Sequence, residues 1–298
     1  MRHKYMLELV GGAFGAIALV TASSVARADA APQVTATGTM TAPEQLLTNS
    51  YTIDLGTFLI SSKVNGNLRG TIQNQTGVDF SQDFGLDANQ NRIRADFLWR
   101  IASRHQVRFA YFNNDVTNTR QISQHITWGD YDFQAGGLVT AETKFNIYEA
   151  TYEYAFIKDR DYDVLVTAGV HVEDFTAKLT GTATITDSNG NVTGPFAAQT
   201  ASNSVTAPLP VIGLRGDWAA TEHLYLDASG QVFKFSYQGV DGNWSDIWVG
   251  ATWMFNEHFG IGLAYDRFAT HVDLTKGSFT GRLNLGYQGG LLFLRGAF

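Results

Sequence analysis

The stretch RADFLWRIASRHQVRFAYF, from Arg94 to Phe112, alternates charged and large apolar residues almost one by one. In an extended chain, every second side chain lies on the same face. Phe97 and Trp99 then share one face, while Arg94 and Arg100 share the other. The pattern predicts two strands of a sheet with an apolar and a charged face. It does not say which face is the inside of the protein.

The composition favours a strand-rich protein and excludes several chemistries. The chain has 298 residues, 30 Gly, 5 Pro and 13% aromatic residues, a mixture typical of sheets rather than helices. It contains no Cys, which excludes disulfides, thiolate metal sites and a Cys nucleophile. The formal charge of −7 argues against a nucleic-acid partner, because such proteins usually carry a basic surplus.

The N-terminus has the pattern of a secretory signal peptide, and we expect residues 1–28 to be removed. A basic start, Arg2–Lys4, precedes an apolar run up to Val20 and a small-residue A-x-A site that ends at Ala28. The alternative is a retained membrane helix, for which the apolar run is short. After Ala28, every apolar run is broken well before the roughly 18 residues that a spanning helix needs.

Residues 29–50 are small and polar, with two prolines, and predict a flexible periplasmic lead-in. From Tyr51 onward the pattern has period two, which predicts strands. Ten candidate strands follow, at 51–64, 91–102, 106–118, 140–157, 162–183, 204–219, 223–236, 246–256, 258–271 and 279–298.

The connections between these strands alternate between short and long. Short turns are expected at 103–105, 158–161, 219–221 and 256–258, and longer polar connections at 65–90, 119–139, 184–203 and 237–245, with a brief one near 276–277. Membrane barrels have short periplasmic turns and longer extracellular loops. We therefore predict an all-β fold for residues 51–298, a transmembrane up-and-down antiparallel β-barrel of ten strands, with eight or twelve as alternatives.

Aromatic residues gather beside the short turns. Trp and Tyr prefer the membrane–water boundary because their rings are apolar and their edges can hydrogen-bond. Four clusters at matching positions predict an interfacial girdle. Its expected members are Trp99, Phe109, Tyr154, Phe156, Tyr162, Trp218, Tyr225, Trp253, Phe255 and Phe259.

The polar faces of the strands carry both signs of charge, interleaved with small residues, as a narrow barrel lumen requires. A soluble barrel or sandwich with the charges in water would also alternate, but it would usually expose more Lys. We therefore place the charges inside. The expected lumen charge network is Arg94, Asp96, Arg100, Arg108, Glu149, Glu153, His171, Glu173, Arg215 and Asp217. Paired charges that simply fill a closed barrel are favoured over a polar path or a solute-binding lumen.

Several segments carry a resemblance to a known family. They are VDFSQDFGLD (78–87), RIASRHQVRFAYF (100–112), APLPVIGL (207–214) and YQGGLLFLRGAF (287–298). With its terminal Phe298 and the alternating apolar residues behind it, the chain resembles the small outer-membrane β-barrel proteins of Gram-negative bacteria over residues 51–298. The resemblance implies location and fold and brings no activity. It implies an insertion signal at Phe298, and as partners the barrel-assembly machinery, the outer-membrane lipids and lipopolysaccharide.

An enzyme that acts on lipid or peptide is the alternative class. Its candidate residues are Ser123, His125, Asp130 and Asp132 in one connection and His271 with Asp273 in another, but neither set matches a barrel-hydrolase motif. His171 and Glu173 supply only two metal ligands, and DSNGN (187–191) lacks the Gly and distal Glu of a calcium loop. We therefore expect no catalytic, cofactor or metal site. The expected function is a monomeric, narrow porin-like channel or a structural, surface-exposed barrel.

Overall fold

The computed structural model describes residues 39–58, 67–72, 92–128, 131–186, 190–237, 240–276 and 279–298. By its contacts the chain divides into Met1–Met40 and Thr41–Phe298, and the second unit contains the fold. The expected signal peptide and residues 29–38 of the expected lead-in lie outside the described residues.

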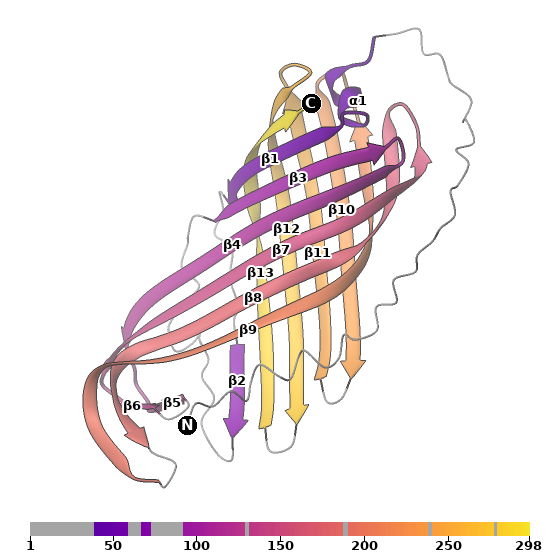
Figure 1. Ribbon diagram of the computed structural model, residues 1–298. Coiled ribbons are helices and arrows are strands. Elements are labelled where there is room, and N and C mark those ends of the chain that lie inside the picture. Colours follow the sequence, from indigo (N-terminus) through magenta and orange to yellow (C-terminus); the bar gives the residue numbers. More distant parts are fainter. Residues whose placement is uncertain are drawn as a thin grey trace. The chain divides into compact units, whose positions relative to one another are not determined.

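In the described residues of the second unit there are one short helix and thirteen strands (Figure 1). Their bounds are α1 Ala42–Leu46, β1 Tyr51–Phe58, β2 Asn67–Ile72, β3 Ile93–Ala102, β4 His105–Gln121, β5 Ile126–Trp128, β6 Tyr131–Phe133, β7 Leu138–Lys158, β8 Tyr162–Thr186, β9 Val192–Ala219, β10 Leu224–Tyr237, β11 Val240–Met254, β12 Phe259–Lys276 and β13 Phe279–Ala297.

Ten of these strands form a closed antiparallel barrel. Its order is β1-β3-β4-β7-β8-β9-β10-β11-β12-β13, and β1 returns to pair with β13 from Thr52↔Ala297 to Phe58↔Leu291. The short strand β2 also pairs with β13, while β5 and β6 extend the sheet from the far end of β8. The prediction of an all-β, up-and-down barrel with ten strands is confirmed.

Three central strands are much longer than a membrane requires. Strands β7, β8 and β9 have 21, 25 and 28 residues, whereas a tilted strand crosses a bilayer in about 9–11. Figure 1 shows β8 and β9 continuing past the short strands β5 and β6, whereas β7 ends before the point where β6 pairs with β8. The expected long connection at 184–203 is therefore wrong for most of its length, because β9 starts at Val192. The one at 237–245 is also wrong, because β11 starts at Val240.

The segment in front of the barrel differs from the flexible lead-in expected for residues 29–50. Thr41 caps α1 through a capping box, in which its side chain accepts from the backbone N–H of Glu44 and its own N–H donates to the Glu44 carboxylate. Leu46 and Leu47 are buried and pack with Tyr225, Met254 and other residues of the barrel rim. This apolar contact fixes the segment, a feature that its polar composition hides.

Candidate functional site

The outer face of the barrel carries a band of apolar side chains. On β8, Tyr162 to Val172 present apolar groups outward at every second position, and Asp174 is the first polar one. At about 3.3 Å per residue and a tilt of about 40°, that stretch is about 25 Å high, which matches the apolar band of outer-membrane barrels. The same change to polar outward residues occurs on seven other strands, at Asn113, Asn146, Thr206, Lys234, Ser245, Arg267 and Gln288.

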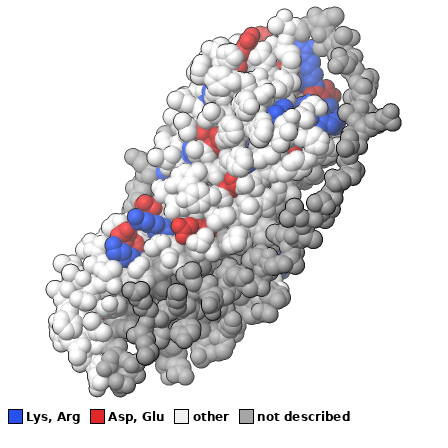
Figure 2. Space-filling model, viewed as in Figure 1, with Lys and Arg blue, Asp and Glu red and all other residues white. Residues whose placement is uncertain are grey.

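The opposite edge of this band carries the aromatic girdle. Eight of the ten expected members have side chains that are 42–60% exposed, namely Trp99, Phe109, Phe156, Tyr162, Trp218, Trp253, Phe255 and Phe259. Tyr225 does not belong to the girdle, because it is only 5% exposed and faces the lumen in phase with Asp227. Figure 2 shows that Lys, Arg, Asp and Glu form small scattered groups on the described part of this face and leave most of it free of charged residues.

A closed barrel with exposed aromatic and aliphatic side chains outside and charged side chains inside has the surface of a protein that lies in a membrane. The chain is a β-barrel of the bacterial outer-membrane type. In the described part of the chain, no helix is long and apolar enough to cross a membrane.

Comparison with known proteins gives only distant structural similarity. No family model and no curated protein matches the chain. Among solved structures, the outer-membrane protease OmpT from Escherichia coli matches with 11% identity and a TM-score of 0.49, covering 83% of this chain and 96% of that chain. The Ail protein of Yersinia pestis matches with 9% identity, 81% and 98% coverage and a TM-score of 0.28. The toluene transporter TbuX of Ralstonia pickettii matches with 12% identity and a TM-score of 0.32, covering 84% of this chain and 73% of that chain.

All ten residues of the expected lumen charge network lie on the inner face of the barrel. Asp96 has a side chain that is 11% exposed, and the other nine are buried. Their orientation follows from the strand register, in which each lies in phase with buried neighbours and out of phase with the apolar band.

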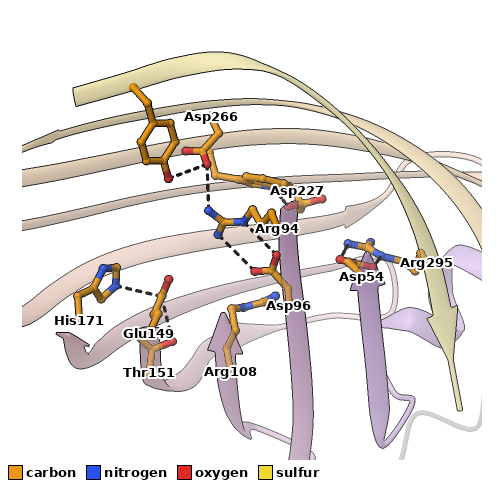
Figure 3. A network of polar contacts seen from close by, with 12 residues as sticks. Asp54, Arg94, Asp96, Arg108, Glu149, Thr151, His171, Asp227, Asp266 and Arg295 are labelled. Carbon is orange, nitrogen blue, oxygen red and sulfur yellow. Dashed lines mark hydrogen bonds and ion pairs between the residues drawn. The ribbon is translucent and has the colours of Figure 1, made fainter. Parts of the chain in front are cut away.

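The network falls into several clusters rather than one continuous path (Figure 3). Arg94 reaches Asp96 at 3.0 Å and, across the lumen, Asp266 on β12 at 2.9 Å. Arg108 pairs with Glu153 at 3.0 Å within its own part of the wall. These contacts pair opposite charges that would be costly to bury alone.

Further clusters lie around these two. Arg215 joins Asp217 at 2.9 Å and Asp227 at 3.1 Å. His171 lies 3.3 Å from Glu149, which also accepts a hydrogen bond from the amide of Gln231. The other predicted members stand apart: Arg100 lies 3.8 Å from Asp163 beside α1, and none of the ion pairs between described residues includes Glu173.

Sequence reasoning missed four charged partners in the lumen. Asp54 and Arg295 form a bidentate pair, with contacts of 2.8 and 2.6 Å, between the two strands that join the chain ends. The sequence contains a signal for the inward position of Asp54, because this residue is a lone charge between Ile53 and Leu55, which face outward. The full set of missed partners is Asp54, Asp163, Asp266 and Arg295.

A second layer in the lumen is aromatic, and the sequence analysis did not anticipate it. The rings of Phe145 on β7 and Phe268 on β12 lie 5.7 Å apart, although their strands are five positions apart in a ring of ten. Phe112 stacks on Tyr287 at 4.3 Å, and Trp244 packs against both Phe268 and His171. Contacts between opposite walls leave the lumen filled at this level.

Between the charged and aromatic layers lies a small cavity of about 10 Å³. A water molecule needs roughly 10–15 Å³, so the space accommodates about one. Its polar lining is Arg94, Glu149, His171, Asp246 and Tyr287, and its apolar lining includes Phe112 and Phe268.

The histidine candidates for catalysis lie outside this lumen. His125 and Asp132 are 3.3 Å apart in the segment of β5 and β6, whereas His271 and Asp273 are 2.9 Å apart on the outer side of β12. Asp130 lies outside the described residues, as do residues 187–189 of the DSNGN segment. Within the ranges that the structure covers, no three His, Asp or Glu side chains group as metal ligands.

Proposed function

We propose that the protein is a sealed barrel that acts as a structural and surface-exposed component of the outer membrane. The observation that carries this proposal is the contact of Phe145 with Phe268 across the lumen. An open pore needs a continuous water-filled path, and barrels with few strands have just enough interior for side chains. The extended strands β7 to β9 then form the part that projects beyond the membrane.

The narrow channel is the second candidate. It is favoured by the charged layer, since rings of paired charges can line a selective path. Conduction would require the ion pair of Arg94 with Asp266 to separate and the aromatic layer to part. Both layers bury their side chains, so we expect the closed arrangement to dominate.

Recording in planar bilayers tests the sealed barrel. We expect the folded wild-type protein to give no ion-conducting steps. The variant Arg94→Ser/Phe145→Ser/Phe268→Ser, which thins both layers, is expected to conduct intermittently and so to show that insertion was successful. Regular steps in the wild type, absent from protein-free bilayers, would overturn the proposal in favour of the channel.

We also propose that the protein is not an enzyme. The two imidazole–carboxylate pairs lie on different elements, and the His125 side chain is 63% exposed, as expected for a solvated loop residue. Lipid and peptide hydrolysis by the refolded barrel should therefore be at background level. A cleavage activity that His125→Ala or His271→Ala abolishes would establish the enzyme instead.

Further proposals concern biogenesis and partners. We propose cleavage after Ala28, recognition of the C-terminal strand by the barrel-assembly machinery, and a monomer surrounded by outer-membrane lipids and lipopolysaccharide. Phe298 supports the recognition of the C-terminal strand by the assembly machinery. Its backbone N–H donates to the carbonyl of Tyr51 and its C=O accepts from the N–H of Tyr51, both at 2.9 Å, while the residue is 54% exposed. Closure of the ring supports the monomer, since each of its ten strands pairs with a described strand on both sides within the ring. N-terminal sequencing that begins at Asp29, and the mass of the detergent-solubilised protein, test these points.

A further inference from the structure

Two carboxylates from adjacent strands lie diagonally opposite on the inner wall, and one of them, Asp246, lines the lumen cavity. Asp246 on β11 lies opposite Phe268, and Asp266 on β12 lies opposite Trp248, so the two acids are diagonal neighbours on the inner face. Side chains in this relation are within reach of each other. Asp266 is fully buried, and the Oδ1 atoms of both acids are buried without a hydrogen-bond partner.

The cations nearby do not balance these acids. The single guanidinium of Arg94 is shared between Asp266 and Asp96, at 2.9 and 3.0 Å. None of the ion pairs between described residues includes Asp246, although its cross-strand neighbours Gln231 and Phe268 are buried. The groups that face the two acids from other strands are Arg94 and Asp96 on β3, Glu149 on β7, His171 on β8 and Tyr287 on β13. Even if His171 carries a charge, this group contains the four carboxylates of Asp96, Glu149, Asp246 and Asp266 and only two cations, Arg94 and His171.

His171 provides an independent sign that something is bound here. It is 2% exposed and lines the cavity, its Nε2 lies 3.3 Å from the Glu149 carboxylate without hydrogen-bond geometry, and its Nδ1 has no hydrogen-bond partner. Buried polar groups are normally satisfied by protein or by ordered water. A water in the adjoining cavity would satisfy a nitrogen of His171 and an oxygen of Asp246 at once.

An unpaired buried carboxylate is usually neutralised by a proton rather than left ionised. We propose that Asp246 and Asp266 share one proton taken up from water, and that one water molecule occupies the cavity and bridges Asp246 to His171. The carboxyl O–H of one acid donates to the other carboxylate, while Arg94 and Tyr287 hold Asp266 from its remaining side. This inference concerns the charge state of the lumen and holds whether or not the barrel conducts.

Infrared spectroscopy of the folded barrel tests the shared proton. At neutral pH we expect a carbonyl stretching band of a protonated carboxylic acid that shifts after long exchange into deuterium oxide. Asp246→Asn and Asp266→Asn should each remove this band, because the remaining acid is then ionised beside Arg94. Glu173→Gln is the matched control, since Glu173 is a buried acid that is also absent from the ion pairs. That variant should leave the band of the pair in place.

The opposite results are equally distinct. Absence of any protonated-acid band in the wild type would overturn the proposal, as would a protonated-acid band that survives in both Asn variants and is not the band that Glu173→Gln removes. If the band is missing and thermal stability instead depends on sodium at constant ionic strength, a metal cation occupies the site in place of the proton. If an Asn variant does not fold, the Glu173→Gln variant decides. Loss of the entire protonated-acid band in that variant would assign the band to Glu173 and contradict the proposal.

Stability against pH gives a second readout. In an unfolded chain an Asp is ionised above about pH 4, so the folded state binds one more proton than the unfolded state. Stability should then fall as pH rises, by up to about tenfold in the unfolding equilibrium constant per pH unit. Asp246→Asn should flatten this dependence, whereas equal slopes in the wild type and in the variant would contradict the shared proton.

Discussion

Single side chains set the orientation of each strand because a shift by one position exchanges its two faces. On β8, Val166 is 43% exposed, whereas its neighbours Leu165 and Thr167 are nearly inaccessible at 0% and 4%. The exposed side chain lies within the apolar band, where only hydrocarbon can solvate it. Its chemistry is therefore constrained by the membrane and not by packing within the protein.

Substitution of Val166 by Arg should destabilise the barrel by about 2–4 kcal/mol, because a guanidinium near the bilayer midplane is poorly solvated. Val192→Arg is the matched control, since Val192 is 65% exposed on the extension of β9. It should change stability by less than about 0.5 kcal/mol. Urea unfolding in lipid vesicles measures both values, and equal costs would mean that Val166 does not face lipid.

Gly262 is a second position where one side chain decides the packing. A Cβ at residue 262 would lie 2.1 Å from the ring of Phe293, which covers this glycine from β13. Gly262→Ala should therefore cost about 1–3 kcal/mol through overpacking of the lumen. In a Phe293→Ala background the same change should cost almost nothing, and an unchanged cost there would show that the ring is not the obstacle.

The elements within the membrane could be predicted closely from the sequence. Strand β3 was expected at 91–102 and spans Ile93–Ala102, and the expected 279–298 corresponds to β13 at Phe279–Ala297. At residues 192–198 of β9 both faces of the strand are exposed, so the period-two signal fades there and the start of β9 was missed by twelve residues. The inward direction of the charged residues was predictable from their phase, whereas their role stays a prediction.

The partners across the lumen could not be predicted. Arg94 and Asp266 are 172 residues apart in sequence, and their contact depends on how far the strands are staggered around the ring. Local alternation carries no information on that stagger. The same limit hid the aromatic layer, whose members Phe112, Phe145 and Phe268 lie in phase with the lumen charges.

Helix α1 is held at the rim by polar contacts that depend on pH. Arg160 donates to Glu44 at 2.7 Å, and Lys158 donates to the carbonyl of Leu47 at 3.1 Å. Burial opposes ionisation of Glu44, but hydrogen bonds from the backbone of Thr41 and from Arg160 outweigh it and lower the pKa of this carboxyl. The folded form therefore favours the ionised Glu44.

The sign of the pH effect follows from this lowered pKa. The contribution of Glu44 is complete above the usual glutamate pKa of about 4.3 and is lost as pH falls through the lower value in the folded protein. Exchange of the Leu47 and Thr48 amides, corrected for intrinsic rates, should accelerate over that range. Arg160→Gln should weaken the pH dependence and Arg104→Gln should not, whereas an equal loss in both variants would contradict the specific role of Arg160.

At the scale of the whole molecule, the barrel is two nested surfaces of opposite character. The outer one is an apolar band about 25 Å high, bounded by aromatic rings and by polar residues. The inner one combines paired charges with rings that touch across the axis. The inner layers replace water as the solvent of the charges, so closure of the lumen and insertion in the membrane depend on the same orientation of the strands.

Site-directed spin labelling along β8 in lipid vesicles tests that orientation most directly. Labels at Val164, Val166 and Val170 should be accessible to oxygen, a label at Thr167 should be shielded from oxygen and from a water-soluble nickel complex, and labels at Asp174 and Thr176 should be accessible to the nickel complex. Accessibility of position 166 to the nickel complex together with oxygen access at position 167 would contradict the account.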